Sequence, residues 1–390
     1  MDRDRRGRRR LNAPAPGKTW QWRAAGLVFA AAGLVASGAV VIAGPAVPAA
    51  AAPAAPATLT AVTAVSCVSA SRCWAGAYDA SGSAIIATAD GGVTWSVQYA
   101  TTRFDDIAGI DCTSAAHCLA IGYAAEDSGA AFLETADGGK IWSTHAAPKS
   151  LALAEAISCA NGLDCWAVGL AGNRFDAAVA RTTDGGGVWT PEPVPALETA
   201  MSSPFGISCA SATVCLVTGE AALTTANGGK TWTRHAVPGG VPLGPVTCPS
   251  ARDCYAVFDV TSAIPSHEQA YLYTSANGGV TWKDVLSAPS HVAGFGGISC
   301  PSTTTCVAVG GGYAPQAGGT DTLYGLSELT STSGRHWAQS TVARAQDLFA
   351  DSCVTRTRDC IAGGQARAAG VILKSANDGV TWTSEPLPKA

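Results

Sequence analysis

The sequence predicts an all-β fold built from seven copies of one four-stranded unit, and three observations support this prediction. The 14 cysteines all follow residue 66 and fall into seven closely spaced pairs. A tryptophan follows each pair by 17–31 residues, and the first cysteines of successive pairs are 39–53 residues apart. No stretch after residue 57 has a sustained 3.6-residue hydrophobic period. Four short strands at this spacing are typical of a propeller blade, so we expect a seven-bladed β-propeller.

The second unit shows how the strands are assigned. Runs of seven to nine residues rich in Ala, Ile, Leu and aromatic residues cover 104–112, 117–124, 130–136 and 140–146, and Gly, Asp or Ser bound them. The same division gives antiparallel blades of four strands from contiguous sequence. The blades are expected at about 58–100, 101–147, 148–195, 196–238, 239–290, 291–342 and 343–390.

Residues 1–57 differ from the rest of the chain and are predicted to direct export. Residues 1–23 are basic, residues 24–44 are apolar and uncharged, and small residues and prolines follow. This order is typical of an export signal. The apolar run is also long enough to span a bilayer. Two interpretations therefore stand: a signal peptide cleaved near Ala49–Ala52, or an uncleaved membrane anchor at 24–44. Both place the propeller outside the cytoplasm, secreted or at the cell surface.

The charge of the exported part argues against nucleic acid as a partner. The whole chain has a formal net charge of −4, and residues 1–57 carry eight basic and two acidic side chains. Residues 58–390 therefore carry a net charge of −10. Nucleic-acid binding depends on Lys and Arg side chains that neutralise phosphates, and an acidic domain is poorly suited to it.

The cysteine pairs are predicted to be disulfides. An even number of cysteines behind an export signal favours disulfides over redox or metal chemistry. Two cysteines per unit, with no His at fixed spacing, are too few for zinc, so we expect no metal. Each bond would close the hairpin between the first and second strands of a unit. The expected bonds are Cys67–Cys73, Cys112–Cys118, Cys159–Cys165, Cys209–Cys215, Cys248–Cys254, Cys300–Cys306 and Cys353–Cys360.

A second repeated motif, [ST]-x-[DN]-x-G-x-x-W, begins with TADGGVTW at 88–95 and is expected between the third and fourth strands. Asp and Asn side chains accept hydrogen bonds from backbone N–H groups about two residues on, Gly takes a positive φ, and Trp buries its ring. The sixth copy, 330–337, departs most, because Thr332 replaces the acid or amide. The residues given this structural role are Asp90, Asp137, Asp184, Asn227, Asn277, Asn377, Trp95, Trp142, Trp189, Trp232, Trp282, Trp337 and Trp382.

This motif resembles the Asp-box, or BNR repeat, of sialidases and related propellers, where it is a structural turn. Sialidases, however, are six-bladed and use three converging arginines with a Tyr–Glu nucleophile pair. The arginine motif that they carry near the start of the domain is not found here. In size the chain is more similar to the photosystem II stability/assembly factor family, seven-bladed propellers with Asp-box-like turns. That resemblance implies the fold and a non-enzymatic mode of action by protein binding.

The loops that vary between units are expected to carry the function. Hairpins 1–2 and turns 3–4 should lie on one face, and loops 2–3 and the connections between units on the other. Variable loops on a rigid scaffold are where binding usually occurs. The longest 2–3 loops are expected at 259–270 and 311–323. Candidate ligand contacts are Arg103, Asp105, Arg174, His267, Glu268, Tyr313 and Asp321.

The sequence therefore favours an exported, monomeric, non-enzymatic propeller without a cofactor, which binds a protein or a cell-surface glycan. A sialidase-like glycoside hydrolase is the alternative, and a cell-envelope scaffold without a small ligand is a third. Neither His267 and Glu268 nor Asp105 and Asp106 form a recognisable catalytic pair, because neighbours on an extended strand point opposite ways. No catalytic residue is assigned.

Overall fold

The computed structural model describes residues 58–124, 129–172, 176–195, 206–237, 243–258, 271–287, 292–314, 322–330, 337–342, 345–367 and 369–388. They belong to one unit, Ala54–Ala390. The strands are β1 (Ala61–Ser69), β2 (Arg72–Asp79), β3 (Gly82–Thr88), β4 (Ser96–Thr101), β5 (Phe104–Cys112), β6 (Cys118–Ala124), β7 (Ala130–Thr135), β8 (Ser143–Ala146), β9 (Leu153–Cys159), β10 (Cys165–Leu170), β11 (Ala177–Thr182), β12 (Thr190–Glu192), β13 (Gly206–Cys209), β14 (Cys215–Thr218), β15 (Ala221–Thr225), β16 (Thr233–Ala236), β17 (Val246–Thr247), β18 (Cys254–Phe258), β19 (Tyr271–Ser275), β20 (Lys283–Ser287), β21 (Val292–Ser299), β22 (Cys306–Ala314), β23 (Thr322–Thr330), β24 (Trp337–Val342), β25 (Asp347–Cys353), β26 (Cys360–Ala366), β27 (Ala369–Ser375) and β28 (Thr383–Glu385).

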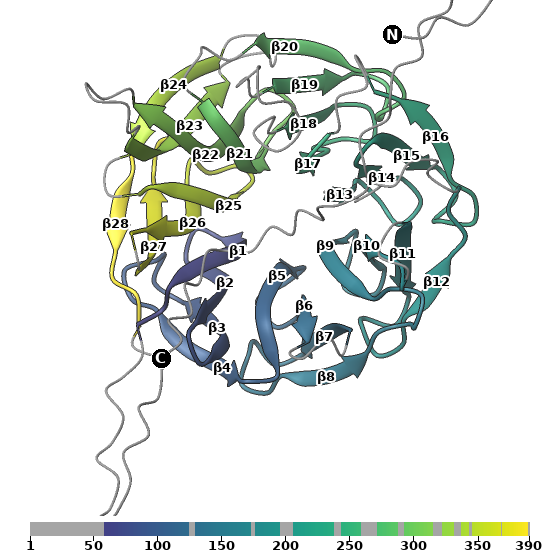
Figure 1. The fold of residues 1–390 in the computed structure, drawn as a ribbon, viewed down its shortest axis with the longest axis horizontal. Helices are drawn as coiled ribbons and strands as arrows, with labels where there is room; N and C mark the ends of the chain where they lie inside the picture. The colour runs from purple at the N-terminus through teal and green to yellow at the C-terminus, as the bar shows by residue number, and fades with distance from the viewer. Residues whose placement is uncertain are drawn as a thin grey trace, which may run out of the picture. The chain divides into compact units, whose positions relative to one another are not determined.

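The described strands pair into seven four-stranded antiparallel sheets, each made of consecutive strands, and we number these sheets one to seven in chain order. Figure 1 shows them around a ring, with the first strand of each sheet innermost and the fourth outermost. The predicted all-β propeller with four-stranded antiparallel blades is confirmed. Within the described ranges, no helix is long and apolar enough to cross a membrane. The apolar run at 24–44 lies outside those ranges.

The hydrophobic core lies between neighbouring sheets. Ile85 of sheet one packs with Ile107 and Leu133 of sheet two in one buried cluster. Phe132 of sheet two stacks on Trp189 of sheet three, with ring centroids 4.3 Å apart. Each sheet therefore needs neighbours to bury its two faces, and this explains why the repeats form a ring.

All seven predicted disulfides are present in the structure. In five sheets the bond joins directly paired residues of the first and second strands, as Cys67 and Cys73 are in register on β1 and β2. In sheets five and six the first cysteine, Cys248 or Cys300, directly follows the end of the first strand. The Cα atoms of the seven pairs are 4.0–4.1 Å apart. All cysteines of the described chain are therefore bonded, and each bond closes a short hairpin.

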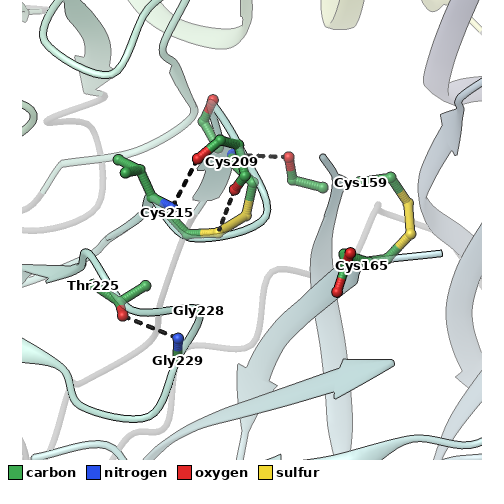
Figure 2. The surroundings of a disulfide bond; sticks show 12 residues. Cys159, Cys165, Cys209, Cys215, Thr225, Gly228 and Gly229 are labelled. Carbon is green, nitrogen blue, oxygen red and sulfur yellow. Dashed lines mark hydrogen bonds between the residues drawn. A yellow bond between two sulfur atoms is a disulfide. The ribbon is translucent and has the colours of Figure 1, made fainter. Parts of the chain in front are cut away.

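Hydrogen bonds join the innermost strands of neighbouring sheets. The residue just before the first cysteine of one sheet accepts a bond from the backbone N of the first cysteine in the next sheet. Six such bonds are 2.7–3.0 Å long, and the one to Cys209 is a dashed line in Figure 2. The acceptor and donor pairs are Ser66 and Cys112, Asp111 and Cys159, Ser158 and Cys209, Ser208 and Cys248, Ser299 and Cys353, and Ser352 and Cys67.

The last of these bonds crosses the junction between sheet seven and sheet one. Ser352 Oγ accepts from Cys67 N at 3.0 Å, and Gly370 N donates to Leu59 O at 2.7 Å. Val62 of sheet one packs with Ile361 and Ile372 of sheet seven. The sheet-to-sheet hydrogen-bond pattern of the repeats therefore continues across this junction, beside the side-chain packing.

Candidate functional site

In the six sheets whose turns are described, the short connections lie side by side on one face, which we call the turn face. It comprises the hairpins between first and second strands and the turns between third and fourth strands. In six sheets a backbone N of the turn donates to a carbonyl of the hairpin at 2.8–3.1 Å. Gly91 N bonds to Ser71 O in sheet one, and Asp378 N to Arg358 O in sheet seven. The opposite ends of the strands define the loop face.

The six described copies of the turn motif share one hydrogen-bond pattern. In the first, the Thr88 hydroxyl accepts from Gly92 N at 2.9 Å and donates to Asp90 Oδ1 at 2.8 Å. Asp90 Oδ1 also accepts from Thr94 N at 2.9 Å, which is four residues on and not two as we expected. The bond from Gly229 N to Thr225 is the equivalent one in sheet four (Figure 2). The Oδ1 atom of the acid or amide therefore accepts hydrogen bonds from groups of the turn itself.

The remaining motif positions also serve the turn. Gly91 and Gly92 have φ of 75° and 95°, values that favour glycine. Trp95, Trp142, Trp189, Trp232 and Trp282 are buried just before the fourth strands, whereas Trp337 and Trp382 are half-buried. The Thr94 hydroxyl is the largest cause that lowers the pKa of Asp90 to about 2. Of the sixth copy, residues 331–336 lie outside the described chain.

The loop face differs from the turn face in how much its connections vary. The fourth strand starts eight residues after the end of the third in six sheets and seven in the other. Between the second and third strands, by contrast, two residues intervene in sheets one, four and seven, and twelve in sheet five. The connections that differ in length between sheets are therefore mainly those of the loop face.

The structure places only part of the predicted ligand-contact set. Arg103 is exposed between β4 and β5, and its N donates to Thr101 Oγ1 at 3.1 Å. Asp105 is exposed on β5 next to the half-buried Asp106. Tyr313 lies on β22, but its side chain is outside the described part. Arg174, His267, Glu268 and Asp321 lie outside the described residues. Their contact with a ligand remains a prediction.

A group of polar side chains near the loop-face ends of sheets one to three forms what we call the loop-face cluster: Thr63, Tyr78, Asp106, Tyr123 and Glu155. Asp106 and Tyr123 are directly paired on β5 and β6. The Thr63 hydroxyl lies 2.7 Å from Ile107 O and 3.0 Å from Asp106 Oδ1. Glu155 acts electrostatically on Tyr123, as Asp106 does. The charges of Asp106 and Glu155 thus both favour the protonated form of Tyr123.

Irregular pairing of the innermost strands places Thr63 and Glu155 in this cluster. In five sheets the register shifts by one residue four positions before the first cysteine, as in a β-bulge. The extra residues are Thr63, Ala108, Glu155, Gly296 and Phe349. All five are half-buried, although their neighbours in these strands are mostly buried or closely packed. Bulges re-aim side chains, and they are common next to functional sites.

The cluster is electrostatically unusual. Burial is the main cause that raises the pKa of Asp106 to about 6, and the Thr63 hydroxyl opposes it. The Thr63 hydroxyl has one proton for two acceptors, Ile107 O and Asp106 Oδ1, so it offsets the burial of Asp106 only in part. Burial also raises the pKa of Tyr123, with Glu155 and then Asp106 adding to the effect. The tyrosine therefore stays protonated and can donate a hydrogen bond.

Sequence reasoning missed most of this cluster. Thr63, Tyr78, Tyr123 and Glu155 were not candidates, and Asp106 was considered only as a neighbour of Asp105. Counting back from the cysteines would have aligned Thr63 with Glu155. The register shift itself could not be seen in the sequence, because the residues at which it occurs are of different types. Among the described residues, no three His, Cys, Asp or Glu side chains gather into a group that could hold a metal ion.

No protein-family model and no curated protein matches this sequence. Among solved structures, YCF48 bound to D1 peptide is similar with a TM-score of 0.56 and 15% identity, over 83% of this chain and 93% of that one. The GH74 xyloglucanase from Xanthomonas campestris gives 0.59 and 14%, over 84% and 55%. The WD40 β-propeller domain of Doa1 gives 0.54 and 13%, over 82% and 96%. At these identities the likeness is one of fold, and the fold is a β-propeller.

Proposed function

We propose that this chain is an exported, non-enzymatic, seven-bladed propeller that binds a protein or a cell-surface glycan through its loop face. The observation that carries the proposal is the division between the faces. The turn face repeats one pattern of hydrogen bonds in six sheets. The connections of the loop face differ in length between sheets, and this face holds the loop-face cluster. A uniform face supports a scaffold, and a variable face on that scaffold supports recognition.

Each sheet is taken as one blade, and the bond from Cys67 N to Ser352 supports a ring that closes after the seventh. The shared bonding of the six described turns supports their assignment as Asp-boxes. In this proposal Asp90, Asp137, Asp184 and their Asn equivalents are structural. We also infer that the propeller is a monomer.

Export is supported by the seven disulfides, which form and persist in oxidising compartments. The order of basic, apolar and small residues in 1–57 supports the same placement. A cleaved signal peptide and an uncleaved anchor at 24–44 both remain open. N-terminal sequencing of the mature protein distinguishes them.

The loop-face cluster sets the chemistry of recognition. Tyr123 offers an aromatic surface with a hydroxyl, and Asp106 and Glu155 offer carboxyl oxygens. Such groups suit the amide and hydroxyl groups of a peptide or a sugar. The YCF48 structure, which holds a D1 peptide, supports a peptide partner only through the shared fold.

Glycoside hydrolysis is the second candidate, because one observation favours it. Two carboxyl groups act on one tyrosine, and Asp106 has the pKa of about 6 that suits a general acid near neutral pH. Hydrolases of this kind use two carboxyl groups about 5–10 Å apart across the glycosidic bond. The xyloglucanase supports this alternative only through its fold.

The deciding experiment uses the full chain expressed into an oxidising compartment and immobilised as bait for culture medium and cell-wall extract. The loop-face variant Asp106→Asn/Glu155→Gln is compared with wild type and with Asp137→Asn. The last variant is the matched control, because Asn replaces Asp in three other turns. We expect a partner retained by wild type and by Asp137→Asn and lost by the loop-face variant.

A glycosidase panel runs in parallel on the same three proteins. Turnover by wild type that disappears in Asp106→Asn/Glu155→Gln would replace the binding proposal with the hydrolase. A partner lost equally by the turn control would instead show that recognition is not on the loop face.

A further inference from the structure

One buried position differs chemically in sheet seven from its equivalent in the other six. Two residues before the first cysteine, six sheets carry a β-branched aliphatic residue, and the seventh carries Asp351. The aliphatic residues are Val65, Ile110, Ile157, Ile207, Val246 and Ile298. They belong to the hydrophobic clusters between sheets or pack against them. An aspartate therefore occupies a site that the fold otherwise fills with a hydrocarbon side chain.

Asp351 faces sheet six at a point of close backbone approach. A Cβ on Gly297 would lie 2.7 Å from Asp351 Oδ1 and 3.0 Å from the Cα of Ala350. In the equivalent place between sheets two and three, a Cβ on Gly109 would meet Ile157 at 3.2 Å. We call the contact between sheets six and seven the 6/7 junction. There the carboxyl group sits where Ile157 and its equivalents sit elsewhere.

The carboxyl group of Asp351 is buried without a hydrogen-bond partner. Both oxygens of Asp351 are inaccessible and lack a hydrogen-bond partner, although the residue as a whole is half-buried. Burial raises its pKa well above the ordinary value, and the amide of Ser299 opposes the shift without forming a bond of good geometry. An ionised carboxylate left in such a place is strongly unfavourable.

The strands packed against β25 offer little charge to offset an ionised Asp351. These strands are β1, β21, β22, β23 and β26. Their titratable residues are Tyr313 on β22 and Tyr324 and Glu328 on β23, and β25 itself adds Asp347. None of these is a cation. The other ionisable type on these strands, cysteine, is held in disulfides.

We propose that Asp351 makes the 6/7 junction a pH-dependent opening point of the ring, closed with the carboxyl neutral and opened with the carboxyl ionised in water. The other junctions lack this dependence at the same position, because a hydrocarbon side chain does not titrate. Opening exposes the innermost strands β21 and β25 and separates sheet seven from sheet six.

The sign follows from linkage. The carboxyl has a raised pKa in the closed ring and an ordinary one, about 4, once solvated. The closed junction is therefore fully favoured below about pH 4 and loses stability as pH rises toward the closed-state pKa. Across that window the opening equilibrium constant grows up to about tenfold per pH unit.

Native-state hydrogen exchange with mass spectrometry of the full chain, at pH 5, 6, 7 and 8, tests the proposal. Asp351→Asn keeps the shape without the charge, and Asp351→Val installs the side chain of the equivalent sites. The intrinsic exchange rate of an amide also rises with pH. We therefore divide the exchange rate of each strand in wild type by its rate in Asp351→Asn at the same pH, which removes this intrinsic dependence. We expect this ratio to rise with pH for β25 and β21, by up to about tenfold per pH unit below the closed-state pKa, and to stay constant for β13 in sheet four.

Asp111→Ser is the control, because Asp111 is also buried but accepts a bond from Cys159 N, as serines do at the equivalent position. It should leave the pH dependence of β25 unchanged. An identical pH dependence of β25 in wild type and Asp351→Asn overturns the proposal. If neither Asp351 variant folds, wild type alone decides, since equal pH dependence of β25 and β13 overturns it too.

Discussion

At the scale of single residues, each of the six described turns depends on one hydroxyl that is both donor and acceptor. Ser275 Oγ accepts from the buried Gly279 N at 2.9 Å and donates to Asn277 Oδ1 at 2.9 Å. Ser275→Ala leaves the Gly279 N–H without an acceptor, which costs about 1–3 kcal/mol of unfolding free energy. Ser275→Thr should be nearly neutral, because Thr holds this position in other turns. Urea unfolding of the two variants measures the difference, and equal losses would contradict it.

The acid of the turn is expected to matter only at low pH. The pKa values of Asp90, Asp137 and Asp184 are lowered, chiefly by hydrogen bonds within the turn. A lowered folded-state pKa gives stability that is present above about pH 4 and lost as pH falls toward 2. Asp90→Asn should therefore match wild type at pH 7 and lose less stability between pH 4 and 2. Thermal unfolding at both ends of that range checks this, and a loss at pH 7 would mean that an amide does not replace the carboxylate in this turn.

At the scale of elements, the disulfides should contribute separately to each hairpin. Closing a loop of seven residues stabilises the fold by about 2 kcal/mol in the chain-entropy model. Cys159→Ala/Cys165→Ala removes the bond of sheet three and should lower the unfolding free energy by about that amount. Denaturant unfolding measures it, and non-reducing mass spectrometry confirms that the other six bonds persist. A variant as stable as wild type would mean that the hairpin is held by its strands alone.

The elements also show how far sequence could predict this protein. The cysteine pairs and the turn motif are local signals of fixed spacing, so both the hairpins and the disulfides were predictable. The register shift that adds Glu155 to its strand was not, because the five extra residues, Thr63, Ala108, Glu155, Gly296 and Phe349, are of different chemical types. The loop-face cluster depends on that shift and on contacts between sheets. Asp351 was visible in the sequence, but only once the strands were aligned on their cysteines.

At the scale of the whole molecule, the ring joins chain ends that are far apart in sequence. Sheets three and four are connected by the chain as well as by the bond from Cys209 N to Ser158 Oγ. Sheets seven and one have no such connection, and Ser352, Gly370 and the packing of Val62 hold them together. Loss of the equivalent hydrogen bond should therefore affect the two junctions differently.

Ser352→Ala and Ser158→Ala test this difference, because each removes one equivalent bond. Each leaves a half-buried N–H without an acceptor and should cost about 1–3 kcal/mol of global stability. Only Ser352→Ala should also raise the local opening of β1 and β25, seen as faster hydrogen exchange under native conditions. Ser158→Ala should leave β9 and β13 protected, because the chain keeps those sheets adjacent. Faster local exchange at both junctions would mean that the hydrogen bonds, rather than chain continuity, hold neighbouring sheets together.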